Sequence, residues 1–337
     1  CLVRAGSVED ARDRLRRAFA TFALDTSRLD EVKVVLGDLS APRLGLGAEY
    51  EELARSVSEV YHAAAHINFV MPYQTVKHVN VDGLRRLLDL CGANGTPLRL
   101  ISTLGVFPPD STSGPVDEDT VPGDPASLGI GYSQSKWVAD HLGLRARELG
   151  LPVTVHRIGR IGGHSLTGAC RHDDFFWLQM KSFAVLGCYP EDILDAQPVD
   201  LLPVDYVARS VVRLSTGKPD NENWHIHHPK GLAWPTVLET IRAEGYALKP
   251  VPRSVWTAAL ERQAETDRQG EGLGSLVPLM REGVMRLGRH SFESGKTIQA
   301  LADVGCPLPA EDTGWLHRMF AYFRALGAVP PPAGRRG

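Results

Sequence analysis

The chain has 337 residues, of which 43% are hydrophobic and 23% are charged, and its formal net charge is −3. These values are typical of a globular protein and exclude the strongly basic surface that nucleic-acid-binding proteins use. Because no run of about 18 apolar residues and no signal peptide is present, we expect no membrane span and a cytoplasmic location.

Short apolar runs alternate with amphipathic stretches through the first half of the chain. Apolar residues at helical spacing predict helices over residues 9–22, 76–91 and 132–149. Apolar runs predict strands over residues 33–39, 60–64, 98–106 and 153–161. Strands separated by helices indicate an α/β fold with a Rossmann-type, doubly wound parallel sheet. Ligands of such sheets bind beyond the carboxyl ends of the strands, so we expect the chemistry just after these four strands.

The pattern changes after Gly162, where helices predominate. Helices are predicted over residues 175–186, 204–214, 235–244, 254–265, 276–287 and 314–326, with one strand over 224–228. We therefore expect three parts. They are a Rossmann-like domain over 1–215, a smaller, mainly helical lobe over 216–329 to which segments near 163–200 contribute, and a disordered tail over 330–337.

A tyrosine and a lysine four residues apart begin the helix predicted over 132–149. Tyr132 and Lys136, in the sequence YSQSK, share one helix face. A nearby ammonium favours the phenolate, so we expect Lys136 to lower the pKa of Tyr132. A tyrosine tuned in this way can give a proton to a carbonyl oxygen and take one back. Thr103, at a predicted strand end, either adds a hydroxyl for the same oxygen or satisfies its own backbone.

These three residues resemble the Thr-Tyr-Lys triad of the extended short-chain dehydrogenases. Within that family, the chain is similar to the thioester reductase domains that close non-ribosomal peptide synthetases, carboxylic acid reductases and aminoadipate reductases. The resemblance runs from Cys1 to about Leu214. It implies that Thr103, Tyr132 and Lys136 are catalytic. It also implies that NADPH reduces a phosphopantetheinyl thioester, held by a carrier protein or domain, to an aldehyde; a second hydride would give the alcohol, which the sequence leaves open.

The resemblance also implies which residues bind the nucleotide end of NADPH. Arg4 and Arg14, ten residues apart, stand where the family binds the 2′-phosphate, and a guanidinium fork suits a phosphate. For Arg14, a solvated helix face is the alternative. Asp38 and Leu39 match the segment beside the adenine, although Asp38 is alternatively a turn or N-cap residue.

A run of small residues at the end of the second predicted strand matches the part of the family's fold that lies beside the cofactor. Ala64, Ala65 and His66 follow one another there, and small side chains allow a ligand to approach the backbone closely. Ala63 stands where many relatives have asparagine. Asn80 matches an asparagine that props the active site in the family. The triad residues themselves also contact the cofactor in these enzymes.

The chain begins with Cys1-Leu2-Val3-Arg4, which resembles the end of the second strand of such a fold. No G-x-x-G-x-x-G loop precedes it, so we expect an N-terminally truncated Rossmann-like domain that can be inactive by itself. Three alternatives stay open. They are a nucleotide-sugar epimerase or dehydratase with the same triad, a fatty acyl-CoA reductase, and a non-catalytic docking fragment. The two arginines and the segment PVDYVA argue against the first.

The cysteines and histidines predict no metal site. The five cysteines are far apart and show no C-x-x-C spacing, which favours reduced thiols. His225 and His227 share one face of the strand predicted over 224–228, but no suitable third ligand lies near them in the sequence.

Overall fold

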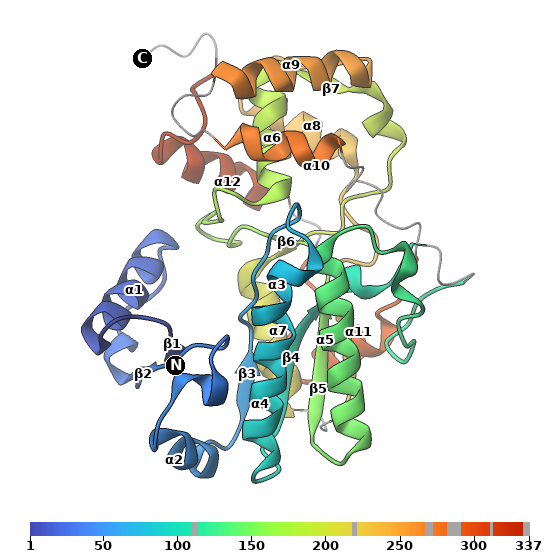
Figure 1. Cartoon of the computed structure of the whole chain (residues 1–337). Coiled ribbons are helices and arrows are strands. Elements are labelled where there is room, and N and C mark those ends of the chain that lie inside the picture. The colour runs from blue at the N-terminus through green and yellow to red at the C-terminus, as the bar shows by residue number, and fades with distance from the viewer. Residues whose placement is uncertain (110–113, 218–220, 267–271, 282–290, 311–312, 333–337) are drawn as a thin grey trace. The chain divides into compact units, whose positions relative to one another are not determined.

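The structure is a computed structural model that describes residues 1–109, 114–217, 221–266, 272–281, 291–310 and 313–332 (Figure 1). The chain forms two compact units, each made of three segments. The sheet unit comprises Cys1–Ile158, Val211–Ile226 and Leu287–Pro307, and the helical unit comprises Gly159–Ser210, His227–Arg286 and Leu308–Gly337. The segments of the two units therefore alternate along the sequence. The tail expected over 330–337 lies outside the described residues from 333 on.

Parallel strands build the sheet unit. β3 (Val60–His62), β4 (Leu98–Thr103), β5 (Val153–Ile158) and β9 (Asn223–Ile226) form a sheet in the order β3-β4-β5-β9. β1 (Leu2–Val3) pairs in parallel with β2 (Val35–Leu36). All three pairings within the four-stranded sheet are parallel. The predicted α/β fold with a Rossmann-type parallel sheet is therefore confirmed.

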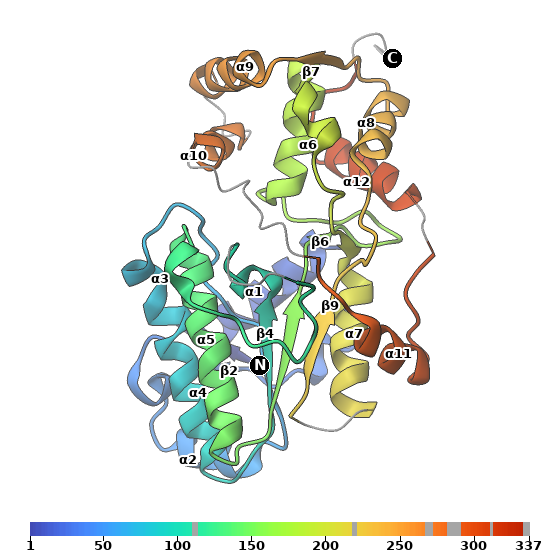
Figure 2. The same cartoon turned by 90° about the vertical axis from the view of Figure 1, so that its right-hand side faces the viewer.

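Helices cover both faces of the four-stranded sheet, as Figure 2 shows. The helices of this unit are α1 (Val8–Thr21), α2 (Glu49–Ser56), α3 (Tyr73–Asn80), α4 (Asp82–Gly92), α5 (Gly131–Glu148), the end of α7 (Val204–Gly217) and α11 (Gly295–Asp303). α4 and α5 lie on one face and α7 on the other. Residues on the strands alternate accordingly, since successive side chains point to opposite faces.

The two faces of the central strands differ in chemistry. Toward α4 and α5 the packing is apolar, with Leu98 and Leu100 of β4 beside Val153 and Val155 of β5. Toward α7 it is polar, because Arg99 of β4 donates to the Ser215 carbonyl oxygen. An apolar face fixes the register of these strands, since a slip by one residue would turn the apolar set away from the core.

Several predicted elements of the sheet unit end or break earlier than expected, and among them the strands predicted over 33–39 and 60–64 end at Leu36 and His62. The helix predicted over 76–91 is two helices, α3 and α4, that meet at Val81 (φ −106°, ψ −58°). The strand predicted over 98–106 stops at Thr103 and continues as a short 3-10 helix, Leu104–Val106. The strand predicted over 153–161 stops at Ile158. α2 and α11 were not predicted.

The helical unit packs around aromatic side chains. Its helices are α6 (Phe175–Leu186), α8 (Trp234–Ala243), α9 (Arg253–Thr266), α10 (Leu276–Arg281) and α12 (Gly314–Ala325). Two short parallel pairs complete it, β6 (Ile161–Gly162) with β8 (Leu202–Pro203) and β7 (Cys188–Pro190) with β10 (Lys249–Val251). In the core, the Trp177 ring stacks on Phe323 with centroids 3.6 Å apart.

Local sequence signals explain where several of these helices begin. The Asp174 carboxylate accepts a hydrogen bond from the Trp177 amide at 3.0 Å and caps α6, as an N-cap aspartate does. α7 follows β8 directly, because β8 ends at Pro203 and α7 begins at Val204. No helix in the described part of the chain is both long and apolar enough to span a bilayer.

Candidate active site

Thr103, Tyr132 and Lys136 lie in two elements that pack against each other in the sheet unit. Thr103 is the last residue of β4, and Tyr132 and Lys136 occupy the first turns of α5. Gly131 lets α5 begin close to the start of α3, because a Cβ there would lie 2.4 Å from the Tyr73 backbone nitrogen. A side chain at this position would therefore displace Tyr132.

Lys136 is buried and anchored to the sheet. Its ammonium donates a hydrogen bond to the carbonyl oxygen of Ile101 at 2.6 Å, and 5% of the residue is exposed. Burial lowers the pKa of Lys136 to about 8, while the Asp140 carboxylate acts in the opposite direction. The pKa of the buried His62, on β3, falls to about 4 through burial and the charge of Lys136. His62 is therefore neutral at pH 7.

Tyr132 is half-buried, and its ring packs edge-on against Phe69 with centroids 5.5 Å apart. Burial raises the pKa of Tyr132 to about 12. The expectation that Lys136 lowers the pKa of this phenol is wrong in this structure, because burial disfavours the phenolate and the Lys136 ammonium is directed to Ile101. Tyr132 is therefore a neutral phenol at pH 7 and can donate a hydrogen bond.

Thr103 lies at the point where β4 meets the start of α5. Its hydroxyl oxygen accepts from the Gly105 amide at 3.1 Å and caps the short 3-10 helix. The backbone contact considered as the alternative role of Thr103 is therefore present. A Cβ on Gly105 would lie 3.5 Å from the Thr103 hydroxyl oxygen and 3.7 Å from that of Ser133. The hydroxyl still has a proton to donate, since it accepts in this contact.

Asn80 holds the loop after β3 against α5. Its amide oxygen accepts from the His66 amide at 2.7 Å, and its amide nitrogen donates to the His66 carbonyl at 3.1 Å and to the Ser135 hydroxyl at 2.9 Å. The Ser135 hydroxyl donates in turn to the Tyr132 carbonyl oxygen at 2.7 Å. Asn80 is buried and thus fixes the backbone around Tyr132 through two hydrogen bonds in series.

Arg4 and Arg14 come together at the end of β1. Arg14 donates to the Arg4 carbonyl oxygen, and the Arg4 guanidinium lies 3.9 Å from an Asp38 carboxylate oxygen. The Arg4 side chain is 72% exposed and open to an anionic ligand. Asp38 accepts from the Ser40 amide and hydroxyl at 2.8 and 2.6 Å, and these contacts first, then Arg4, lower the pKa of Asp38.

The remaining residues that the sequence assigned to the cofactor follow the ends of β2 and β3. Ala64 is exposed, and Ala65 and His66 are half-buried in the loop after β3. The carbonyl oxygen of Leu39, just past β2, accepts from Arg86 at 2.9 Å. The exposed Ala64 after β3 and the exposed Arg4 guanidinium after β1, both at carboxyl ends of parallel strands, fit a dinucleotide with its phosphate groups.

Three buried residues next to the triad were missed by the sequence analysis. Asp140 lies one turn after Lys136 on α5 and pairs with Arg157 of β5, with 3.0 Å between Oδ1 and Nη2. The Ser102 hydroxyl, next to Thr103, donates to Asp140 at 2.7 Å. The spacing of four residues from Tyr132 to Lys136 to Asp140 was the available signal.

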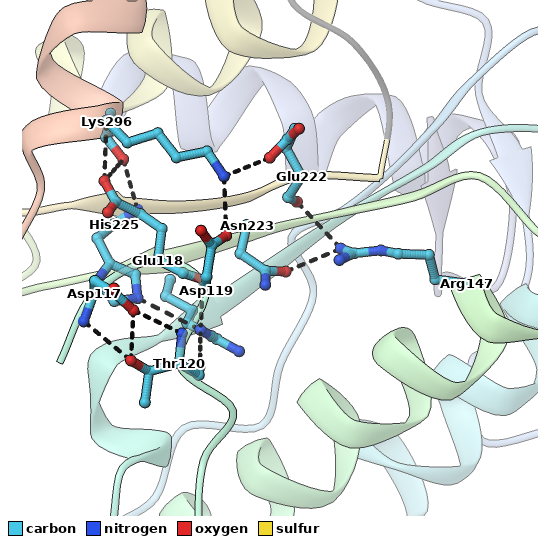
Figure 3. Close-up of polar contacts among 11 residues, drawn as sticks. Asp117, Glu118, Asp119, Thr120, Arg147, Glu222, Asn223, His225 and Lys296 are labelled. Atoms are coloured by element: carbon cyan, nitrogen blue, oxygen red, sulfur yellow. Dashed lines mark hydrogen bonds and ion pairs between the residues drawn. The ribbon is translucent and has the colours of Figure 1, made fainter. Parts of the chain in front are cut away.

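His225 has a structural role in the sheet unit. Its amide donates to the Thr297 hydroxyl at 2.9 Å, and that hydroxyl donates to the Glu118 carboxylate at 2.7 Å. Lys296 pairs with both Asp119 and Glu222, at 3.1 and 2.6 Å (Figure 3). These contacts hold α11 on β9. In the described ranges, no group of three or more His, Cys, Asp or Glu residues is placed to hold a metal ion.

Comparison with known proteins gives consistent matches. Residues 1–211 match the sequence profile of an NAD-binding family described as Male sterility protein. The chain is 33% identical over 340 residues to one of the subunits of linear gramicidin synthase from Brevibacillus parabrevis, a match that covers 98% of this chain and 6% of that protein. It is 31% identical to the terminal R domain from the myxalamid PKS-NRPS biosynthetic pathway, with a TM-score of 0.87, over 98% of this chain and 85% of that one.

A thiolation-reductase di-domain from an archaeal non-ribosomal peptide synthetase has the same fold, with 20% identity and a TM-score of 0.81, over 97% of this chain and 70% of that one. The chain spans only part of the first two curated relatives, 6% and 23% of their lengths. The match to the R domain, in contrast, extends over most of both chains. The chain therefore belongs to the NAD(P)-binding family described as Male sterility protein, among the extended short-chain dehydrogenases, and within it is similar to the reductase domains of non-ribosomal peptide synthetases.

Proposed function

We propose that this chain reduces a thioester, attached to the phosphopantetheine arm of a carrier domain, to an aldehyde with NADPH. One observation carries the proposal. Thr103, at the end of the parallel strand β4, packs against the start of α5, which bears Tyr132 and Lys136 on one face, and the chain matches this family. The existence of a solved thiolation-reductase di-domain with this fold supports a carrier domain as the partner.

NADPH, when bound, supplies a hydride to the thioester carbonyl carbon. Tyr132, a neutral phenol at pH 7, donates a proton to the carbonyl oxygen, and the Thr103 hydroxyl donates a hydrogen bond to it. The adduct is a thiohemiacetal. Its carbon–sulfur bond then breaks while the Tyr132 phenolate takes back the hydroxyl proton, so that the aldehyde leaves together with a thiolate, which takes a proton from solvent to give the free thiol. The Lys136 ammonium, next to the phenol on the helix, stabilises the negative charge that develops during proton transfer.

The preference for NADPH rests on Arg4 and Arg14. Their guanidinium groups lie at the end of β1, and Arg4 is exposed to a ligand. A 2′-phosphate at this position gains charge-assisted hydrogen bonds that NADH cannot make. The Asp38 carboxylate lies 3.9 Å from the Arg4 guanidinium, and its pKa is lowered, so it is ionised at pH 7.

The proposal is tested by comparing thioesters that share one acyl group but differ in the group that carries it. The full-length protein is assayed with NADPH and the acyl group on a carrier domain, on pantetheine and on coenzyme A, and with a UDP-sugar as the alternative substrate. We expect the fastest NADPH oxidation with the carrier-bound thioester, with the aldehyde trapped by an amine reagent and any alcohol quantified beside it.

Each competing function gives a different result in the same assay. Equal or faster turnover of the coenzyme A ester would indicate an acyl-CoA reductase, and turnover of the UDP-sugar an epimerase or dehydratase. A folded protein that binds the carrier domain and reduces none of these substrates would be a docking module. Any of these outcomes overturns the proposal.

A further inference from the structure

Asp140 is a buried carboxylate next to the proposed catalytic residues that the chemistry above does not use. It has no exposed surface and lies one helical turn after Lys136 on α5. Its Oδ2 accepts from the Ser102 hydroxyl at 2.7 Å and from Arg157 Nε at 3.2 Å, and its Oδ1 accepts from Arg157 Nη2 at 3.0 Å. Both carboxylate oxygens therefore accept hydrogen bonds from Ser102 or Arg157.

The partners of Asp140 come from two neighbouring strands. Ser102 of β4 and Arg157 of β5 face each other in the strand register and point to the side of α5. Arg157 is fully buried, and it also donates to the Thr120 carbonyl oxygen at 2.9 Å, in the turn that Figure 3 shows. Asp140 thus joins α5 to both strands at the residue that precedes Thr103.

Asp140 also affects the charge of Lys136. The His62 ring, on which the Lys136 charge acts, is neutral at pH 7, and the Asp140 carboxylate favours the protonated amine. Arg157 is the cation paired with this carboxylate. The contact of both carboxylate oxygens with Arg157 holds the carboxylate in one orientation.

We propose that Asp140 is a positioning residue: it fixes the Thr103 end of β4 against the α5 face of Tyr132 and Lys136, and it places a negative charge one helical turn after Lys136. The proposal rests on the function proposed above, because it assigns Asp140 a part in that reaction. Asp140 acts through Ser102 and Lys136 and does not touch the substrate.

The charge of Lys136 can be measured without any turnover. In protein labelled with [13C]lysine, the Lys136 side-chain signal, assigned with Lys136→Arg, gives the pKa of the amine from its shift with pH. In Asp140→Asn we expect this pKa to fall by about one unit or more, because the Asp140 charge favours the protonated amine and a nearby opposite charge has an effect of that size. In Ser102→Ala, which keeps all charges, we expect the Lys136 pKa to stay near that of the original chain.

A second variant controls for the possibility that Asp140→Asn does not fold. Asp140→Asn leaves the buried Arg157 without its partner, which can destabilise the protein. The pair Asp140→Asn with Arg157→Met removes both charges, so we expect it to fold, as judged by circular dichroism, and still to show the lowered Lys136 pKa. An unchanged Lys136 pKa in this folded pair overturns the proposal, whether or not the chain reduces thioesters.

The pH dependence of kcat gives a second measurement. In the pair variant, we expect the alkaline limb of the kcat profile to move to lower pH with little change in KM, because the protonated amine is lost earlier. A purely structural role would lower the rate equally at all pH values and leave the limb in place, which contradicts the proposal. If the original chain reduces no thioester, the proposed function fails, while a shifted Lys136 pKa still supports the link between Asp140 and Lys136.

Discussion

Burial acts in opposite directions on the two titratable groups that begin α5. It raises the pKa of Tyr132 to about 12 and lowers that of Lys136 to about 8. At pH 7 the phenol is therefore neutral and the amine mostly protonated. The proposed reduction needs these two protonation states, because the neutral Tyr132 phenol gives the proton and the protonated Lys136 amine supplies a positive charge.

Replacing Tyr132 by phenylalanine removes the hydroxyl and leaves the ring packed on Phe69. We expect Tyr132→Phe to lower the rate of thioester reduction by roughly 10²-fold or more, the lower range for lost acid catalysis. The assay is NADPH oxidation by the full-length protein. Tyr50→Phe makes the same change at a buried tyrosine of α2 and should leave the rate unchanged. A rate unaffected by Tyr132→Phe would remove Tyr132 from the mechanism.

Arg4 is expected to distinguish the two nicotinamide cofactors. Arg4→Ala should weaken NADPH binding by roughly 10-fold or more, the loss of one hydrogen bond to a charged group, and should leave NADH binding nearly unchanged. Isothermal titration of both cofactors measures this. Arg16→Ala is the matched control, because Arg16 pairs with Asp13 on the exposed part of α1. Equal losses for NADPH and NADH would reject the assignment of the 2′-phosphate.

At the scale of the elements, helix ends with a local signal were predicted well. α6 has the predicted bounds because Asp174 caps its start and Gly187, with φ 63°, ends it in the left-handed conformation. The break between α3 and α4 was missed because the apolar periodicity continues across Val81. At the end of α3 the chain is held by the hydrogen bonds of Asn80 with His66 and Ser135. These residues are distant in the sequence, so no local sequence pattern predicts the contact.

The packing of α6 on α12 is expected to be a main source of stability in the helical unit. Trp177 is 1% exposed and contacts both Phe323 and Phe320. Trp177→Ala should lower the free energy of unfolding by about 3–5 kcal/mol, the cost of a large cavity. Urea denaturation followed by circular dichroism measures it. Leu166→Ala, at a residue 77% exposed in the same unit, should change it by less than about 0.5 kcal/mol. A similar small change for both variants would contradict this account of the core.

At the scale of the whole molecule, two buried histidines link stability to pH. Burial lowers the pKa of His62 to about 4, and burial followed by the charge of Arg99 lowers that of His156 to about 3, from 6.5. The unfolded chain therefore binds more protons than the folded chain between these values. The stability that the neutral histidines contribute is complete above pH 6.5. It is lost as the pH falls from 6.5 to the folded-state pKa values of about 4 and about 3.

Unfolding measured in urea at several pH values tests this link. We expect the free energy of unfolding to decrease from pH 6.5 to 4, and the double variant His62→Gln and His156→Gln to reduce that decrease by about 2 kcal/mol or more, given about 1.4 kcal/mol per pKa unit. His78→Gln, at an exposed residue, should leave the slope unchanged. An unaltered slope in the double variant would show that other groups govern acid unfolding.

The sequence by itself determined the features that depend on short distances along the chain. The alternation of strands and helices indicated a parallel α/β fold, and the four-residue spacing of Tyr132 and Lys136 placed them on one helix face. Their resemblance to a known triad located Thr103 at a strand end. These conclusions needed only the periodicity of a strand or helix and the residues at its ends.

Tertiary structure alone decided what surrounds these residues. Asp140, Ser102 and Arg157 meet because β4 and β5 pair side by side under α5, which brings together segments that are distant in the sequence. Burial, which depends on the packing of whole elements, raises the Tyr132 pKa. The alternation of the two units along the chain has the same origin, since β9 and α11 join the sheet by packing contacts between distant segments.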